Sequence, residues 1–445
     1  MRSLRTLVIP GAFLAAVVAA RALLARPPAA IAVDLAQPLV VVTQWHGYGA
    51  ALLALLVAAI LAGAVAYASA FRTETPMLAA QVAGVAAVAL AAAWCLPVLF
   101  SSDVYAYAAY GQLVRLGANP YAHAAPAGGN ALLSAAAWQW GNALPVCVYG
   151  PAFVALAWAT VALLAPLGTL AQLDGMRALA CAALLLCVPL AYAAFPGNAA
   201  ARLRAAALVG LNPAAIWCAA EGHNDAIALA AVLGGFALVR RGHATAGAAI
   251  TAVSALLKPP GIAAAIALGV VNRRARAGAI AGIATAAAGS VPLLAGVATG
   301  LAPHGRYGAQ ASLQAVVQSL ALLFSRDERL ASLAAVAVAA LACTLLARAG
   351  LARLRRGDDE GWIRLGLAAW VLVPNPYPWY GIWLVALAGL APRSRAATVA
   401  ILLSFTSLLR YAPDAIGTPP AAAALAIGLA AALPLLGLCY NERPV

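Results

Sequence analysis

Residues 49–70 read GAALLALLVAAILAGAVAYASA, a stretch of 22 residues without a charged side chain. An α-helix needs about 20 apolar residues to cross the hydrocarbon core of a bilayer. Similar runs recur along the chain, at residues 7–25, 77–100, 277–297, 330–349 and 420–438. We therefore expect an all-α fold, a polytopic transmembrane bundle of about 11–14 helices, organised as a single integral membrane domain over residues 1–445.

The composition supports a membrane protein. Of the 445 residues, 65% are hydrophobic and 9% are charged, whereas roughly half of a soluble domain is apolar. The formal net charge of +14 would suggest nucleic acid binding in a soluble protein, but here the arginines cluster in short loops between apolar runs, as in cytoplasmic loops. We expect a multi-pass protein of the bacterial inner membrane, with the lipid bilayer and not nucleic acid as its partner.

The arginine pattern predicts a topology with a cytoplasmic N-terminus. The arginines that would lie inside are Arg72, Arg177, Arg240, Arg241, Arg273, Arg274, Arg276, Arg353, Arg355, Arg356, Arg393 and Arg395. Residues 101–148 then form a folded extracytoplasmic loop with an interfacial helix. Residues 150–168 would return inside and residues 177–195 would lead out again. Because this count disagrees with the later arginines, we expect a partial or re-entrant segment between residues 178 and 220.

Two later stretches look like short helices that meet at a polar break, Lys258-Pro-Pro260 and Asn375-Pro-Tyr-Pro-Trp379. Irregular backbone at membrane depth is tolerated only against protein or a water-filled cavity. We expect both re-entrant or broken helices to open on the same outer side as the loop 101–148. The expected arms are 244–257 and 260–271 at the first break, and 362–375 and 379–391 at the second.

Asp103 is the strongest candidate for a general base among only 13 acidic residues. It begins the stretch DVYAYAAYGQLVR, where Asp103, Tyr107 and Tyr110 share one face of a helix. A carboxylate there can accept the proton of a sugar hydroxyl as the hydroxyl attacks. The alternative is an Asp that caps the N-terminus of this helix.

The sequence Glu221-Gly-His223-Asn224-Asp225 interrupts an apolar background. Polar side chains at a membrane boundary are costly unless they are paired or functional, so the cluster predicts a site. The alternative is a cap for a helix over 225–239, with His223 satisfied by a neighbour. Glu221, His223 and Asp225 also have the chemistry of metal ligands, so a divalent metal stays open, although we expect no cofactor.

Lys258 is the only lysine in the chain. A compact ammonium at a helix break suits a phosphate oxygen, and the alternative is a lysine that snorkels to the membrane surface.

Aromatic residues near the outer surface either stack on sugar rings or anchor at headgroups; these are Tyr149, Trp379 and Tyr380. Outer arginines either hold a phosphate or bind anionic lipid; these are Arg115, Arg306 and Arg410.

Seven short motifs between residues 100 and 385 resemble, in matching order, the polyprenol-phosphate-mannose-dependent alpha-1,6-mannopyranosyltransferases of actinobacterial lipoglycan assembly, which belong to the GT-C class. The motifs are Asp103-Val-Tyr105, Gly117-Ala-Asn-Pro-Tyr121, Tyr149-Gly-Pro151, Asn212-Pro213, Gly222-His-Asn-Asp225, Lys258-Pro-Pro260 and Pro378-Trp-Tyr380.

The resemblance implies a GT-C-like fold, a groove for a polyprenyl-phosphate-sugar donor, and inversion at the anomeric carbon during transfer to a glycan or glycolipid acceptor. Asp103 matches the catalytic Asp of the first outer loop, and Lys258 and Arg115 are candidates to stabilise the leaving phosphate. Nothing in the residues distinguishes mannose from another sugar. The substrate- or donor-binding candidates are Tyr107, Arg115, Tyr149, Glu221, His223, Asn224, Asp225, Lys258, Trp379 and Tyr380.

Two other classes remain open at this stage. A transporter or lipid flippase would also have many helices and broken segments, but its polar residues gather near the bilayer midplane. The absence of an internal repeat and the convergence of polar motifs on one face favour an interfacial enzyme over both a transporter and a purely structural membrane protein.

Overall fold

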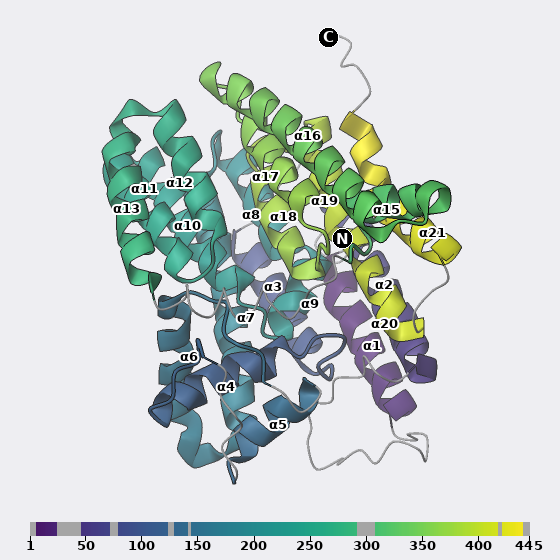
Figure 1. The fold of residues 1–445 in the computed structure, drawn as a ribbon. Coiled ribbons are helices and arrows are strands. Elements are labelled where there is room, and N and C mark those ends of the chain that lie inside the picture. Colours follow the sequence, from purple (N-terminus) through teal and green to yellow (C-terminus); the bar gives the residue numbers. More distant parts are fainter. Residues whose placement is uncertain are drawn as a thin grey trace.

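The computed structural model describes residues 6–24, 46–71, 79–122, 129–140, 144–291, 308–416 and 421–438. Within these ranges every regular element is a helix (Figure 1), which confirms the all-α class. The α-helices are α1 (Val8–Leu24), α2 (His46–Phe71), α3 (Ala79–Trp94), α4 (Asp103–Arg115), α5 (Ala131–Gln139), α6 (Pro151–Leu164), α7 (Thr169–Ala194), α8 (Ala199–Gly210), α9 (Pro213–Ala220), α10 (Asp225–Arg240), α11 (Ala244–Val253), α12 (Pro260–Val271), α13 (Arg276–Gly289), α15 (Leu313–Ser325), α16 (Glu328–Arg355), α17 (Glu360–Leu372), α18 (Gly381–Ala388), α19 (Arg395–Thr406), α20 (Ala412–Ile416) and α21 (Ala421–Ala432).

All six apolar runs of the sequence contain helix where the structure describes them. Residue 25 of the first run, residues 77–78 of the third, residues 292–297 of the fourth and residue 420 of the last lie outside the described residues. By length and composition, three described helices can cross a membrane as single spans: Gly49–Ala68, Thr169–Ala194 and Glu328–Arg355. A fourth candidate is the pair α8 and α9, which bend by 49° at a short break. The fold is a helical membrane bundle that combines these long helices with shorter apolar ones.

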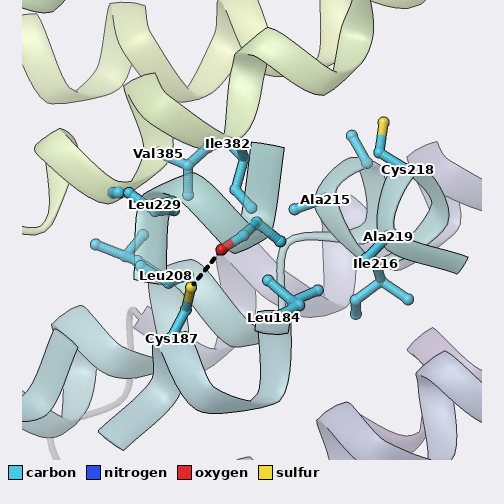
Figure 2. Packing of buried hydrophobic residues seen from close by; sticks show 14 of the residues in the cluster. Leu184, Cys187, Leu208, Ala215, Ile216, Cys218, Ala219, Leu229, Ile382 and Val385 are labelled. Carbon is cyan, nitrogen blue, oxygen red and sulfur yellow. Dashed lines mark hydrogen bonds between the residues drawn. The ribbon is translucent and has the colours of Figure 1, made fainter. Parts of the chain in front are cut away.

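The centre of the bundle is formed by α7, α8, α9 and α10, with α18 packed against them. Figure 2 shows Cys187 of α7 among Leu208 of α8, Leu229 of α10 and Val385 of α18. The Cys187 thiol donates to the carbonyl of Ala226 at 3.5 Å. This core joins residues far apart in the sequence and holds the site segments that follow α9 and precede α18.

The two ends of α10 define the two ends of the molecule. At its N-terminus, Asp225 pairs with Lys258; we call this the Asp103 end. At its C-terminus, Arg240 donates to the carbonyl of Ala194 at 3.2 Å and pairs with Asp359; we call this the Arg240 end. The 16 residues of α10 separate the two ends by about 24 Å.

The predicted directions of α6 and α7 are wrong. Because Ala194 lies beside Arg240, α7 runs from the Asp103 end to the Arg240 end. With its 14 residues, α6 is only about 21 Å long, and it packs along α4, where a Cβ on Gly111 would strike the carbonyl of Ala157. It belongs to the layer of α4, α5 and α6 at one end of the molecule (Figure 1).

The expected breaks are confirmed. The span between residues 178 and 220 is broken at Asn212-Pro213, where the Asn212 side chain caps α9 and Pro213 occupies its first turn. A 3-10 turn and Lys258-Pro259 separate α11 from α12, and residues 373–380 separate α17 from α18. Proline removes a backbone donor and starts a new helix readily, so these three breaks follow from local chemistry.

Candidate active site

Helix α4 begins at Asp103, as the sequence predicts, but Asp103 is not its cap. Ser102 occupies the N-cap position and makes no side-chain cap bond. The Asp103 carboxylate instead accepts a hydrogen bond from the Tyr107 hydroxyl through Oδ2 at 3.1 Å. Its side chain is 15% exposed, so this carboxylate is partly open to a substrate.

Tyr107 connects Asp103 to Tyr149. The two tyrosine hydroxyls lie 3.3 Å apart, and the Tyr107 ring stands edge-on to Tyr149 and Phe153, with centroids 5.0 Å away in each case. The Tyr121 hydroxyl donates to the Tyr149 carbonyl at 3.2 Å. The Asn-Pro-Tyr121 motif therefore holds the backbone of the Tyr149-Gly-Pro151 motif.

Gly150 allows the outer loop to pass directly against the first break. A Cβ at this position would overlap the carbonyl of Leu256, and the Gly150 amide donates to the Leu257 carbonyl at 3.4 Å. A larger residue cannot occupy this crossing. The contact brings Tyr149 to Lys258, whose ammonium lies 5.8 Å from the Tyr149 ring centroid and 5.1 Å from that of Tyr380.

Lys258 is buried and does not snorkel. Its ammonium donates to Asp225 Oδ2 at 2.6 Å and to Asn224 Oδ1 at 3.2 Å. The other oxygen of Asp225 accepts from the Trp383 indole at 2.8 Å. An ammonium has three hydrogens, so one donor of Lys258 remains for a ligand.

The turn 221–224 is built for these contacts and not for capping. Gly222 has a φ of +96°, and a Cβ there would press on Val104 of α4 and Arg177 of α7. Asn224 holds the N-cap position of α10 without a side-chain cap bond. The capping alternative is therefore wrong, because the side chains of Asn224 and Asp225 face Lys258 instead.

His223 lies between two carboxylates. Its Nδ1 is 3.6 Å from Asp103 Oδ2, and its Nε2 is 3.9 Å from Glu221 Oε2. The ring stacks on Trp379 with centroids 3.8 Å apart and an interplanar angle of 17°. Trp379 in turn stacks on Tyr377 at 4.4 Å. Two parallel rings this close cannot share one face of the indole, so both faces of Trp379 are covered and neither is open to a sugar.

Glu221 is buried in the turn after α9. Its Oε1 accepts from the backbone amide of Leu99, in the segment that leads into α4. Burial raises the pKa of the Glu221 carboxyl well above its usual range. Glu221 therefore braces the segment that carries Asp103 and favours the protonated form.

A family model described as alpha-(1->6)-mannopyranosyltransferase, N-terminal domain, matches residues 5–274, more than half of the chain. The chain belongs to this family. No curated protein and no solved structure gives a match. The matched region of the mannosyltransferase contains Asp103, Tyr149, the turn 221–224 and Lys258, while the second break at residues 373–380 falls outside it. Family membership decides against the transporter and flippase alternatives and against a purely structural protein.

The sequence missed Arg177 of the mannosyltransferase, which was expected in a cytoplasmic loop. The side chain is buried and donates to the carbonyls of Trp94 and Ala220, each at 2.7 Å. It thereby caps the C-termini of α3 and α9 beside the site, where a cation is favourable. The available signal was an arginine nine positions inside a long apolar helix.

Two further residues of the site, Tyr377 and Trp383, were not singled out from the sequence. Tyr377 lies in the second break and Trp383 in the first turn of α18, on either side of the predicted Trp379 and Tyr380. The Tyr377 ring lies under the Arg410 guanidinium at 4.8 Å and its hydroxyl accepts from Arg410 at 3.3 Å. Arg410 is thus joined to the site through Tyr377, Trp379 and His223.

The structure does not bring Arg115 to this cluster. It is exposed at the C-terminal end of α4, 12 residues and about 18 Å beyond Asp103. Arg306 lies outside the described residues. Among the described residues, no three His, Cys, Asp or Glu side chains are grouped to hold a metal ion, since Asp225 faces Lys258 and Trp383.

Proposed function

We propose that the mannosyltransferase moves mannose from a polyprenyl-phosphate-mannose donor to a hydroxyl of a glycan or glycolipid acceptor, with inversion, on the extracytoplasmic face of the bacterial inner membrane. Mannosyl transfer rests on family membership. We propose in addition the donor, the acceptor, the stereochemistry and the side of the membrane.

The observation that carries it is the setting of Asp103. Tyr107 and His223 both approach Oδ2, which leaves Oδ1 for the acceptor hydroxyl. In the reaction the acceptor oxygen bonds to the anomeric carbon, the bond from that carbon to the phosphate oxygen breaks, and Asp103 takes the hydroxyl proton. A positioned base of this kind contributes about 10²–10⁴-fold to the rate.

The stereochemistry follows if a single carboxylate, Asp103, acts as a general base and no carboxylate acts as a nucleophile. A single displacement inverts the anomeric carbon, and the family is named for an alpha product. The donor mannose should therefore be beta-linked to its phosphate. Glu221 is not available as a nucleophile for a double displacement, because it is buried and bonded to Leu99.

Hydrogen-bond donors for the leaving polyprenyl phosphate lie at the first break and in the adjacent turn 221–224. Lys258 has one hydrogen left after its bonds to Asn224 and Asp225. The Asn224 side-chain NH₂ is buried and has no hydrogen-bond partner, a state that a phosphate oxygen would relieve. Together they can stabilise the negative charge that develops on the phosphate.

The charge distribution supports an extracytoplasmic site. Arg240 and Arg241, together with Arg353, Arg355 and Arg356, lie at the opposite end of α10 from Lys258. Cytoplasmic loops are the ones enriched in arginine. With the Arg240 end inside, the Asp103 end meets substrates outside.

The test is mannosyl transfer by purified protein in detergent, from polyprenyl-phosphate-mannose to a mannoside acceptor. Asp103→Asn should lower kcat by about 10²–10⁴-fold and leave donor binding within about threefold, because Asn keeps the shape and loses the base. Asp327→Asn is the matched control, since Asp327 caps α16 on the surface and Asn caps equally well. Full activity of Asp103→Asn, or transfer from a nucleotide sugar alone, would contradict the proposal.

A further inference from the structure

Three buried polar atoms without hydrogen-bond partners follow one another beside Asp103. They are Oε2 of Glu221 and both ring nitrogens of His223. Nε2 faces Oε2 at 3.9 Å, and Nδ1 faces Asp103 Oδ2 at 3.6 Å. A buried polar group without a partner is unfavourable, so three in a row indicate an arrangement in which they form hydrogen bonds with one another during the reaction cycle.

Counting protons identifies one such arrangement. A neutral imidazole has one donor and one acceptor. If Glu221 is protonated, its hydroxyl donates to Nε2 of His223, and Nδ1 then carries the hydrogen that points to Asp103. All three atoms gain partners. The burial that raises the pKa of Glu221 favours this protonated form.

We infer that His223 is a positioning residue for the base: its neutral ring, held by protonated Glu221, donates to Oδ2 of Asp103 and turns Oδ1 toward the acceptor hydroxyl. This inference rests on the proposed role of Asp103. Each gap must shorten by less than about 1 Å to reach hydrogen-bond length. Because Leu99 binds the other oxygen of Glu221, the carboxyl is anchored to the same segment that leads into α4.

The groups that face His223 and Glu221 come from several elements. The face of the ring is covered by Trp379, beyond which lie Tyr377 and Arg410. Arg177, Tyr411 and Cys218 lie near Glu221. From α4 come Asp103 and Tyr107, and from α10 comes Asp225, which is paired with Lys258.

The pH dependence follows with a definite sign. The hydrogen bonds from Glu221 to His223 and from His223 to Asp103 require a protonated Glu221. They are therefore present below the raised pKa of Glu221 and are lost as the pH rises through it. We expect kcat of the wild type to fall on the alkaline side for this reason. Glu221→Gln retains a donor at the position of Oε2 and cannot ionise, so its alkaline fall should disappear, and its kcat should exceed that of Glu221→Ala.

Variants of His223, the middle residue of the row, test the same hydrogen bonds. His223→Phe keeps the stacking on Trp379 and removes both nitrogens, so kcat should drop about 10–100-fold, below the full general-base effect, while KM changes less than about threefold. His223→Asn returns an amide donor near Nδ1 and should recover part of kcat without the alkaline fall. Glu328→Gln, on the surface at the start of α16, should keep the wild-type profile.

The experiment is the pH profile of kcat and KM for these variants in the mannosyl transfer assay, after their fold is checked by thermal unfolding in detergent. An unchanged alkaline fall in Glu221→Gln, or wild-type kcat in His223→Phe, would overturn the inference. If His223→Phe does not fold, the Glu221→Gln profile decides alone. An active Asp103→Asn would instead reject the proposed base, so the two failures are distinguishable.

Discussion

The two ends of the mannosyltransferase differ in whether all their buried and half-buried polar groups have partners. At the Arg240 end the charged groups are paired with one another: Arg353 with Asp358 at 2.6 Å, Arg364 with Glu360 at 2.7 Å, and Arg240 with Asp359 at 3.2 Å. At the Asp103 end, His223, Glu221 and Asn224 keep buried polar atoms without partners. Among the described residues, no atom of that kind lies at the Arg240 end.

This difference shows at which end the protein's own side chains satisfy the buried polar groups, and at which end some of them are left for a substrate. Buried polar groups are normally satisfied, and the Arg240 end obeys this rule with its own side chains. The Asp103 end leaves donors and acceptors for a hydroxyl and a phosphate, which is an arrangement that enzymes tolerate at their sites. Substitutions at the two ends should therefore have different consequences.

The largest effect is expected at Lys258. Lys258→Met leaves the buried carboxylate of Asp225 unpaired, which should destabilise the protein by about 3–5 kcal/mol and abolish measurable transfer. Adding Asp225→Asn removes the unpaired charge and should restore most of the stability, as measured by unfolding in detergent, but not the transfer. Recovery of transfer in the double variant would show that Lys258 serves only as a partner of Asp225.

Arg177→Gln should come next. It removes charged hydrogen bonds to the ends of α3 and α9, and bonds to charged groups contribute about 1.5–3 kcal/mol each. We expect a loss of at least about 2 kcal/mol in the unfolding free energy together with a lower kcat, because the segments that carry Asp103 and Glu221 lose their common brace. A stable and fully active variant would mean that the two segments hold their positions without it.

Tyr107→Phe is a smaller change at the same end. It removes the hydroxyl that binds Asp103 and approaches Tyr149 and keeps the ring contacts. One hydrogen bond is worth about 1 kcal/mol, so kcat should fall about five- to tenfold with stability nearly intact. Measuring kcat and KM separately checks this, since a change in KM alone would assign Tyr107 to substrate binding.

The smallest effect is expected at the Arg240 end. Arg240 and Asp359 are 42% and 34% exposed, and pairs of this kind contribute at most about 1 kcal/mol. Arg240→Gln should lower stability by no more than that, less at high salt, and leave transfer unchanged. A double-mutant cycle with Asp359→Asn measures the coupling, and a loss of transfer would refute the separation of the two ends.

The local elements of the fold and site could be predicted because their causes are local. The breaks at Lys258-Pro-Pro260 and residues 375–380 follow from proline chemistry, and α4 begins at Asp103, in the region where the sequence predicts a helix. The break between residues 178 and 220 was predicted without its position, which the structure places at Asn212-Pro213. The direction of α7 could not be predicted in this way. A hydrophobicity count cannot distinguish a crossing helix from α6, which is apolar and lies along α4.

The same limit applies to side-chain roles. The arginine pattern assigned Arg177 to a cytoplasmic loop. That assignment was wrong, because its side chain binds the carbonyls of Trp94 and Ala220, which are 83 and 43 residues away in the sequence. Trp379 was expected either to stack on a sugar ring or to anchor at lipid headgroups, and only the contacts show that His223 and Tyr377 cover its two faces. Partners brought from distant helices leave no signature in the neighbouring sequence.

The amino-acid sequence alone established the membrane-type composition, the helical class, the positions of two of the three breaks and the set of polar residues from which a site can be made. These depend on hydrophobicity, proline and capping, which act over a few residues. Only the tertiary structure decided that Asp103, His223 and Glu221 form a row, that Lys258 is paired with Asp225, and that α6 does not cross between the two ends. Those outcomes depend on which helices pack together, since packing sets the distances between residues that the chain keeps far apart.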